Sequence, residues 1–479
     1  MPRSIVIHGH YYQPPREDPW LEEIQLQPTA APFHDWNERI DSECYRPITA
    51  ARVLDAGGHI ARIVNTLAYT SFNFGPTLLT WMERASPETY DAVREADKVS
   101  AARLGGHGNA MAQAYHHTIL PLASRRDKTT EVRWGIADFL DRFGRRPEGM
   151  WLPETAVDDE TLDVLAEEGI RYTILAPHQV TAPPARGLPG LYRTSNGREI
   201  AIFVYDGPLS HGIAFGNLLR DGAAWAARLT DGLDEEDAAQ DTVQDAATEQ
   251  PELLSMATDG ETYGHHHRFG EMALAKVVDT LERRRDVRME NFASFLARHP
   301  ARTPVSLVTP SAWSCTHGVE RWRADCGCGA STTSPSQQWR APFREAMQQL
   351  ADGVHAVFER DASAYFSDPW EARNQYVSDG FAERGLDVRA RELLEMERNT
   401  LRLFTSCAWF FDDLDRLEPL QIMRYAARAI ELAGAEGPAL EERLLAHLAE
   451  ARSSDPDAGT ARDIYLRKAK NVSASLAGA

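Results

Sequence analysis

The sequence predicts an α/β fold, either a barrel or an open parallel sheet, followed by a mainly helical region. Over roughly the first 300 residues, short apolar runs alternate with helical patterns, which is typical of βαβ units. Beyond about residue 340 the apolar residues recur at helical spacing instead. Because 479 residues are many for one compact core, we expect two or three structural units.

Five short apolar runs in the first part of the chain are predicted strands. Two segments with apolar residues at helical spacing lie among these runs, one before the second run and one before the third. Gly144 and Gly169 follow the two segments and are placed to end a helix. In the C-terminal region the same spacing predicts two further helices. The strands are Ser4–Ile7, Gly149–Leu152, Tyr172–Leu175, Glu199–Tyr205 and Leu253–Thr258; the helices are Glu131–Phe143, Thr161–Glu168, Leu393–Phe404 and Ile422–Leu432.

Two segments lack such patterns. Residues 231–252 are acidic and rich in alanine and glutamine, which indicates a solvated helix or surface insertion rather than a binding site. The polar tail after Ser453 is predicted to be frayed.

Composition and charge restrict the partners. Lys and Arg total 51 against 71 Asp and Glu, a formal charge of −20, whereas nucleic acid and anionic membranes need a basic surface. No run approaches the roughly 18 uncharged apolar residues of a membrane span, and the N-terminus lacks a signal-type apolar core, so we predict a cytoplasmic protein. Five cysteines in this length do not make a disulfide framework. The net negative charge would neither favour nor oppose the binding of an uncharged sugar. The oligomeric state is not predictable.

Three polar clusters fall at the ends of predicted strands. These are His8-Gly9-His10, Glu154 and Asp259-Gly260-Glu261. Because loops at the carboxyl ends of strands build the active sites of barrels and open α/β sheets, the three clusters are expected to meet in one cleft. Taken singly, each has a plainer interpretation, such as a helix N-cap, a surface carboxylate or a structural histidine.

Two carboxylates in one cleft are what glycoside hydrolysis requires. Aromatic and histidine rings beside them would offer flat faces to the apolar C–H faces of a sugar. Such rings lie in or next to the three clusters, at His8, His10, Trp151 and Tyr263.

Together these residues resemble the motifs of glycoside hydrolase family 57, whose members are retaining enzymes active on α-glucans. The resemblance covers about 260 residues, with four motifs in the family's order. A fifth is altered, because Ser406-Cys407-Ala408-Trp409 has Cys407 in place of a carboxylate. The four are His8-Gly9-His10-Tyr11-Tyr12-Gln13-Pro14, Gly105-Gly106-His107 leading to Tyr115-His116-His117-Thr118-Ile119-Leu120-Pro121-Leu122, Trp151-Leu152-Pro153-Glu154, and Asp259-Gly260-Glu261-Thr262-Tyr263-Gly264.

The resemblance implies a (β/α)7-type incomplete barrel followed by a mainly helical C-terminal domain, as in the branch of the family with an appended helical region of unassigned function. The predicted units are a catalytic barrel at 1–300, a Cys/His-containing loop region at 301–340 and a helical domain at 341–479 that completes the substrate cleft.

The resemblance also implies roles. Glu154 would be the nucleophile and Asp259 the general acid/base of a double displacement on an α-glucan or maltooligosaccharide, with no cofactor required. His10 and His117 would contact the sugar beside the scissile bond and Glu261 would support the site. Hydrolysis, transfer and branching all stay open. The complete set of predicted substrate-binding residues is His8, His10, Gln13, His117, Trp151, Glu261, Tyr263 and Trp409.

A separate cluster brings together Cys315, His317, Cys326 and Cys328. Three cysteines and one histidine make a complete tetrahedral zinc set, although Cys-x-His and Cys-x-Cys are tighter than usual zinc spacings. A structural zinc site, reduced thiols near the cleft and a redox pair remain open.

Two rival functions are compatible with the same residues. In a metal-dependent carbohydrate hydrolase or deacetylase, His8, His10, His117 and Asp259 would hold zinc with Glu154 as base. In a catalytically inactive glucan-binding protein, the carboxylates would have lost their geometry.

Overall fold

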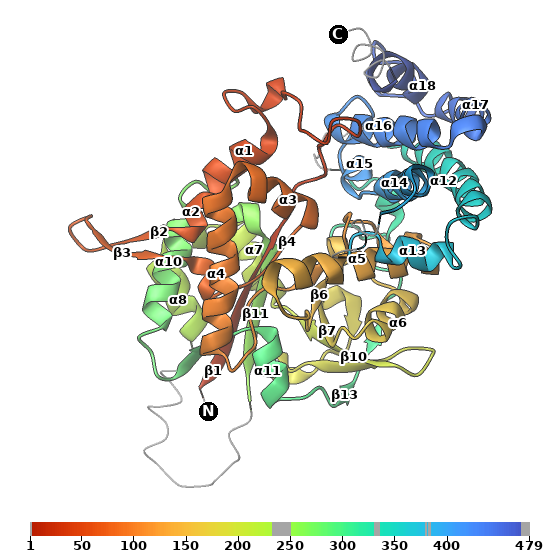
Figure 1. Cartoon of the computed structure of the whole chain (residues 1–479). Coiled ribbons are helices and arrows are strands. Elements are labelled where there is room, and N and C mark those ends of the chain that lie inside the picture. Colours follow the sequence, from red (N-terminus) through yellow and green to blue (C-terminus); the bar gives the residue numbers. More distant parts are fainter. Residues whose placement is uncertain (1, 232–250, 330–335, 379–380, 382–384, 471–479) are drawn as a thin grey trace, which may run out of the picture.

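The structure is a computed structural model that describes residues 2–231, 251–329, 336–378, 381 and 385–470. Figure 1 shows an α/β barrel, coloured red to green, with a helical region in cyan and blue packed beside its upper end.

Seven parallel strands follow one another around an incomplete barrel in the described part of the chain. The first strand is central, since it pairs with the last strand on one side and with the second on the other. Single parallel bridges, Phe72 to Ala110 and Gly149 to Tyr172, continue the arrangement. The strands are β1 (Arg3–Tyr11), β4 (Ser71–Phe74), β5 (Ala112–Gln113), β6 (Met150–Trp151), β7 (Tyr172–Leu175), β10 (Glu199–Val204) and β11 (Leu253–Asp259).

The barrel is not closed by a strand ladder between β10 and β11 in the described residues. Instead, the backbone N–H of Asp206 donates to the carbonyl of Ser255 at 2.7 Å. The predicted fold class, an incomplete barrel of parallel strands followed by helices, is confirmed.

Helices surround the barrel because each connection between parallel strands must return along its outside (Figure 1). Gly144 ends the long fifth helix in the left-handed conformation (φ 67°), as its position in the sequence predicts. The helices are α1 (Trp36–Ile40), α2 (Arg46–Thr49), α3 (Pro76–Ala85), α4 (Pro87–Arg103), α5 (Arg125–Phe143), α6 (Asp159–Glu167), α7 (Gly207–Ala214), α8 (Gly222–Thr230), α10 (Gly270–Leu281) and α11 (Phe292–Arg298).

Short strands decorate the barrel: β2 (Ala51–Leu54) and β3 (Ile60–Val64) form a hairpin, and β8 (Val180–Thr181), β9 (Gly190–Arg193), β12 (Val287–Met289), β13 (Thr303–Pro304) and β14 (Ser306–Leu307) lie at its edges.

The C-terminal region has its own apolar core, separate from that of the barrel. Phe343, Leu393 and Tyr425, which lie on three of its helices, are completely buried there. The helices are α12 (Arg340–Ala362), α13 (Pro369–Gln375), α14 (Val388–Arg402), α15 (Cys407–Phe410), α16 (Leu417–Leu432), α17 (Gly437–Leu448) and α18 (Ala461–Ile464).

Polar contacts fasten the helical region to α5 of the barrel. The indole N–H of Trp134 donates to the carbonyl of Arg373 at 2.9 Å. The buried Arg373 guanidinium bridges Asp127 on α5 and Glu397 on α14, at 2.8 and 2.7 Å. Because removing one partner would leave a buried charge unpaired, this network fixes the helical region against the barrel.

Three sequence predictions need comment. His8 and His10 lie within β1, which is longer than predicted, and not beyond its end. The tail was expected to be frayed from Ser453, but Ala461, Ile464 and Tyr465 are completely buried, so that prediction is wrong as far as residue 470. Most of the acidic segment lies outside the described residues. None of the described helices has the length and apolar character needed to cross a membrane.

Candidate active site

A cavity of about 690 Å³ opens at the carboxyl ends of the strands, between the barrel and the helical region. Glu154, Asp259 and Glu261 line it from the barrel. Phe410 and Glu418 line it from the helical region. Both parts of the chain therefore contribute to one site.

The two predicted catalytic carboxylates reach this cavity from different strands. Asp259 is the last residue of β11 and is paired in register with His10 of β1. It is followed by Gly260, where a side chain would meet the Tyr11 ring at 2.1 Å, so a residue without Cβ is required there. Glu154 lies in the turn after β6.

Backbone strain accompanies two residues that line the cavity. Glu154 has φ 58° and ψ 20°, and His117 has φ 59°. Few residues other than glycine adopt this left-handed conformation, which costs of order 1 kcal/mol or more and is concentrated at functional sites. The turn thus holds Glu154 in a direction that a relaxed strand end would not give.

Three hydrogen bonds from one loop hold Glu154. The indole N–H of Trp313 and the hydroxyl of Ser314 both donate to its Oε2, at 3.0 and 2.5 Å. The backbone N–H of Trp313 donates to its carbonyl at 3.0 Å. Because carboxylate oxygens are stronger acceptors when ionised, the two side-chain bonds favour the anionic form of Glu154.

The surroundings distinguish the two carboxyl groups. Asp259 is exposed to the open cavity, but desolvation by the cavity walls, together with the negative charges of Glu261 and Glu154, raises its pKa well above the ordinary value. Desolvation also raises the pKa of Glu154, but there the hydrogen bonds from Ser314 and Trp313 oppose it. Asp259 is therefore the group that retains a proton, and Glu154 the group that loses it first.

Glu261 is held in place by hydrogen bonds from two tyrosines. Its Oε1 accepts hydrogen bonds from the Tyr45 hydroxyl and from the backbone N–H of Tyr12. Burial raises the pKa of Glu261 to about 7, against the effect of these bonds. Gln13 also lines the cavity and accepts a hydrogen bond from Arg16 at 3.0 Å.

A row of neutral imidazoles forms the wall beside the carboxylates. Asn73 donates its amide to Nδ1 of His10 at 2.9 Å, which leaves the proton of that ring on Nε2. His10 Nε2 can then donate to Nε2 of His117 at 3.1 Å, and His117 Nδ1 to the Ser406 hydroxyl at 2.6 Å. Burial lowers the pKa of His10 to about 3 and that of His117 well below 6.5, so both rings are neutral at pH 7.

Comparisons with known proteins identify the family of the chain. Residues 5–307, more than half of the chain, match the model described as Glycosyl hydrolase family 57. The chain belongs to this family. Residues 336–478 match a domain described as of unknown function, DUF3536.

Curated relatives of this family 57 chain match only in part. Alpha-amylase 1 of Dictyoglomus thermophilum is 29% identical over 103 residues, 22% of this chain and 14% of the relative. An alpha-amylase of Pyrococcus horikoshii is 28% identical over 141 residues, 29% of this chain and 21% of the relative. The chain thus spans about a fifth or less of these relatives.

Solved structures share the fold. An exo-type maltose-forming amylase from Pyrococcus sp. ST04 has a TM-score of 0.72 at 16% identity, over 98% of this chain and 88% of that one. A branching enzyme from Thermococcus kodakaraensis has a TM-score of 0.55 at 15% identity, over 95% and 92%. A 4-alpha-glucanotransferase from Thermococcus litoralis gives 0.54 at 16%, over 90% and 59%.

The structure brings together most, but not all, of the residues that the sequence predicted. Glu154, Asp259, His10, Gln13, His117 and Glu261 line the cavity. His8, Trp151, Tyr263 and Trp409 do not, and each is at most 1% exposed. Direct contact of these four with a sugar, which we expected, is therefore not supported by their positions in the family 57 site.

The four buried residues lie behind the cavity wall instead. The Trp151 ring stacks on His8 and His10, with centroids 4.8 and 5.1 Å apart. Tyr263 contacts Thr258 in the barrel core. Trp409 donates to the carbonyl of Arg340 inside the helical region. A motif tryptophan can thus be required for packing behind a site as well as for stacking within it.

Several residues of the site carried no recognised signal. Asn73 and Ser314 were not singled out in the sequence, and Ser406 was noted only as part of the altered fifth motif. A search for polar residues at every strand end would have found Asn73, which is on β4 opposite His10.

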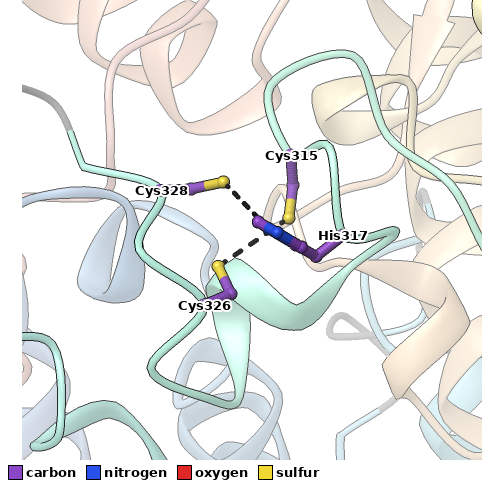
Figure 2. A group of neighbouring side chains, drawn as sticks. All are labelled: Cys315, His317, Cys326 and Cys328. Atoms are coloured by element: carbon purple, nitrogen blue, oxygen red, sulfur yellow. Dashed lines mark hydrogen bonds between the residues drawn. The ribbon is translucent and has the colours of Figure 1, made fainter.

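The geometry does not favour a zinc ion held by His8, His10, His117 and Asp259. Nε2 of His8 contacts Asn73 at 3.1 Å, and its Nδ1 contacts Ser71 at 3.0 Å, so both ring nitrogens are engaged behind the wall. Within the described ranges, the residues that gather as ligands are Cys315, His317, Cys326 and Cys328, with all four donor atoms within 4.8 Å of one another (Figure 2).

Replacing Ser314 with alanine removes one hydrogen bond from the Glu154 anion. A hydrogen bond to a charged group contributes about 1.5–3 kcal/mol. With Glu154 as the nucleophile that the resemblance to the family implies, we therefore expect kcat/KM to fall about ten- to a hundredfold. The pKa of Glu154 should rise, so the acid limb of the kcat/KM profile should move to higher pH. Profiles measured on a maltooligosaccharide check this.

Ser311→Ala is the matched control, because the Ser311 hydroxyl is in the same loop but accepts from Gln179. An unchanged acid limb in Ser314→Ala, or an equal shift in both variants, would contradict the role given to Ser314.

Proposed function

We propose that this chain is a retaining glycoside hydrolase or transglycosylase that acts on α-glucans, with Glu154 as nucleophile and Asp259 as general acid/base. The observation that carries the proposal is the unequal environment of two carboxyl groups in one cavity. Hydrogen bonds favour the anion of Glu154, whereas the surrounding negative charges favour the protonated form of Asp259. A nucleophile and an acid must differ in this way.

In the first step, the Glu154 carboxylate attacks the anomeric carbon as the bond to the leaving oxygen breaks. Asp259 gives its proton to that oxygen, so the leaving sugar departs as an alcohol. The rings of His10 and His117 are neutral, so they line the cavity without adding a positive charge that would stabilise an ionised Asp259.

In the second step, Asp259 acts as base. It takes a proton from water or from another sugar hydroxyl, whose oxygen attacks the anomeric carbon and releases Glu154 as a carboxylate. Two inversions give net retention. Water as acceptor gives hydrolysis, and a sugar gives transfer.

The substrate class is supported by the relatives and by the cavity. The names of the similar proteins describe amylases, a glucanotransferase and a branching enzyme. Aromatic side chains at Tyr12, Trp36, Phe410 and Phe411 line the cavity and offer apolar faces to sugar C–H groups. A cavity of about 690 Å³ has room for a few sugar units.

The test is incubation with maltooligosaccharides of defined length and with amylose, followed by separation of products by length and linkage. NMR of the first product gives its anomeric configuration, for which we expect α. Products longer than the substrate would indicate transfer. A β product, or no turnover of any α-glucan at high enzyme concentration, would contradict the proposal; binding without turnover would favour the inactive glucan-binding protein instead.

A further inference from the structure

We propose that Cys315, His317, Cys326 and Cys328 bind one zinc ion and that this ion fixes the loop that carries Trp313 and Ser314 against Glu154. The metal site stands on its own geometry. Its effect on Glu154 rests on the proposed function of that residue.

The four donor atoms converge as zinc ligands do (Figure 2). Sγ of Cys315 lies 4.0 Å from Sγ of Cys326, and Sγ of Cys328 lies 3.5 Å from Nδ1 of His317. Tetrahedral zinc, with bonds of about 2.3 Å to sulfur and 2.0 Å to nitrogen, holds its ligand atoms about 3.5–3.8 Å apart. These two pairs are already within a few tenths of an ångström of zinc geometry, and because all four donor atoms lie within 4.8 Å of one another, no pair has to close by more than about 1 Å.

The donor set also matches zinc chemically. Three thiolates and one imidazole form a closed structural site with no open position for water. A disulfide between Cys315 and Cys326 would involve only two of these groups and would not account for the position of Cys328 and His317 beside them. Gly327 between two ligands has φ 80°, which lets the chain turn so that both sulfurs face one point.

The loop needs such a constraint. Between the end of β14 at Leu307 and the start of α12 at Arg340, the described residues contain one short 3₁₀ turn, at Glu320–Trp322. Long irregular loops inside a compact fold are uncommon unless they are functional or held together. A metal that binds both halves of the loop would supply the missing cross-link.

The metal ligands are directly continuous with the contacts to Glu154. Cys315 follows Ser314 in the chain and forms an isolated antiparallel bridge with Ala312. The turn between them presents Trp313 and Ser314 to the Glu154 carboxylate. A shift of Cys315 would therefore move both donors.

The other side of the cluster is fastened to the helical region. Arg340, at the start of α12, donates to the carbonyl of Cys328 at 2.9 Å. Arg321 donates to the carbonyl of Ser314 at 3.1 Å and to that of Phe410 at 2.8 Å. The ion would thus join the loop, the Glu154 turn and the helical region into one rigid unit, as outer-shell contacts do around metal sites.

The first experiment measures metal in the full-length protein purified without chelator. We expect about one zinc per chain in the wild type and a loss of most of it in Cys326→Ser and Cys328→Ser. Asp325→Asn, which removes an exposed charge beside Cys326, and Cys407→Ser, which removes a thiol outside the cluster, are controls that should retain it. Wild-type protein without zinc, or variants with unchanged zinc, would overturn the metal site.

Because a protein without its metal can fail to fold, the wild type also needs a direct measurement. Exchange of zinc for Co²⁺ should give the intense visible bands of a tetrahedral thiolate site, whereas Co²⁺ bound by surface carboxylates gives weak octahedral spectra. Titration of thiols in denaturant with chelator should find all five cysteines of the sequence reduced. A finding of three, which indicates one disulfide, would overturn the proposal.

The effect on Glu154 is measured separately. Removal of zinc by a chelator should lower kcat/KM about ten- to a hundredfold with a smaller change in KM, and should move the acid limb to higher pH, as in Ser314→Ala. Removal of zinc from Ser314→Ala should shift the acid limb less than removal of zinc from the wild type. If the wild type binds zinc but its removal leaves the acid limb at the same pH, only the positioning role is overturned. If the wild type binds one zinc but has no activity, the proposed function is overturned and the metal site is not.

Discussion

Replacement of Glu154 with glycine is expected to lower kcat/KM by about 10⁴-fold or more, and azide is expected to restore turnover. Without the carboxylate no covalent intermediate can form, and removal of the attacking group of a hydrolase costs rates of this order. The glycine leaves space on the side of the anomeric carbon that Glu154 occupied. Azide, which is small and anionic, can attack from there.

The product identifies the residue more strictly than the loss of rate does. With an aryl α-maltooligoside as substrate, attack from the side of Glu154 inverts the centre once and gives the β-glycosyl azide. NMR of the isolated azide measures this. Glu154→Gln should be equally inactive but should respond little to azide, because the amide fills the space.

Glu418→Gln is the matched control, since Glu418 lines the same cavity from the helical region. We expect it to lower kcat/KM by no more than about tenfold, with no response to azide. Near wild-type activity of Glu154→Gln on all α-glucans, or an α-azide from Glu154→Gly, would contradict the role of Glu154.

Much of the fold follows from local patterns in the sequence. The predicted strand at Tyr172–Leu175 matches β7, and the helix ended by Gly144 was correctly placed at its C-terminus. Continuous apolar runs between glycines identify such elements because both faces of a barrel strand are buried. The short strands β5 and β6 carry only two residues each, too few for any period, and only the pairing between them defines their extent.

The site was predictable where chemistry and strand ends coincide. Glu154, Asp259 and His10 belong to clusters of polar residues beside apolar runs, and all three reach the cavity. Trp313 and Ser314 could not be found in this way, because their contacts with Glu154 join positions 159 and 160 residues apart along the chain. Such contacts depend on the path of an irregular loop, which no local period encodes.

The burial of Trp151 and Trp409 was also beyond the sequence. A tryptophan beside a catalytic motif can face the substrate or the core, and its direction depends on neighbours that come from other elements. Trp151 of β6 stacks on His8 and His10 of β1 inside the barrel, although β4 and β5 lie between these two strands in the strand order. Trp409 turns inward against Phe343 of α12.

Replacement of Asp259 with alanine is expected to separate the two steps of the reaction. On a glucan, whose leaving group must be protonated, kcat/KM should fall about 10²–10⁴-fold. On an α-maltosyl fluoride, which needs little acid assistance, the first step should stay within about tenfold of the wild type, and the intermediate on Glu154 should accumulate because no base activates water. A burst of fluoride followed by slow turnover measures this.

Azide also distinguishes the roles of the two residues, because the azide product expected from Asp259→Ala has the opposite anomeric configuration to that from Glu154→Gly. In Asp259→Ala azide enters in place of the acceptor and attacks the intermediate, so the second inversion gives the α-glycosyl azide. A β-azide, or equal losses on glucan and fluoride, would contradict the role of Asp259.

The pH dependence follows from the same assignment. In the wild type, activity is lost as the pH falls through the pKa of Glu154, since the nucleophile must be ionised, and is lost as the pH rises through the pKa of Asp259, since the acid must be protonated. Desolvation in the cavity raises the pKa of both groups, so both limbs should lie at higher pH than they would for ordinary carboxyl groups. The Asp259→Ala variant on the fluoride should lose the alkaline limb and keep the acid one, because only Glu154 still has to ionise for the first step. An alkaline limb that survived this substitution would have to belong to another group, and Glu261, whose pKa is raised to about 7 in the same cavity, would then be the residue to replace next.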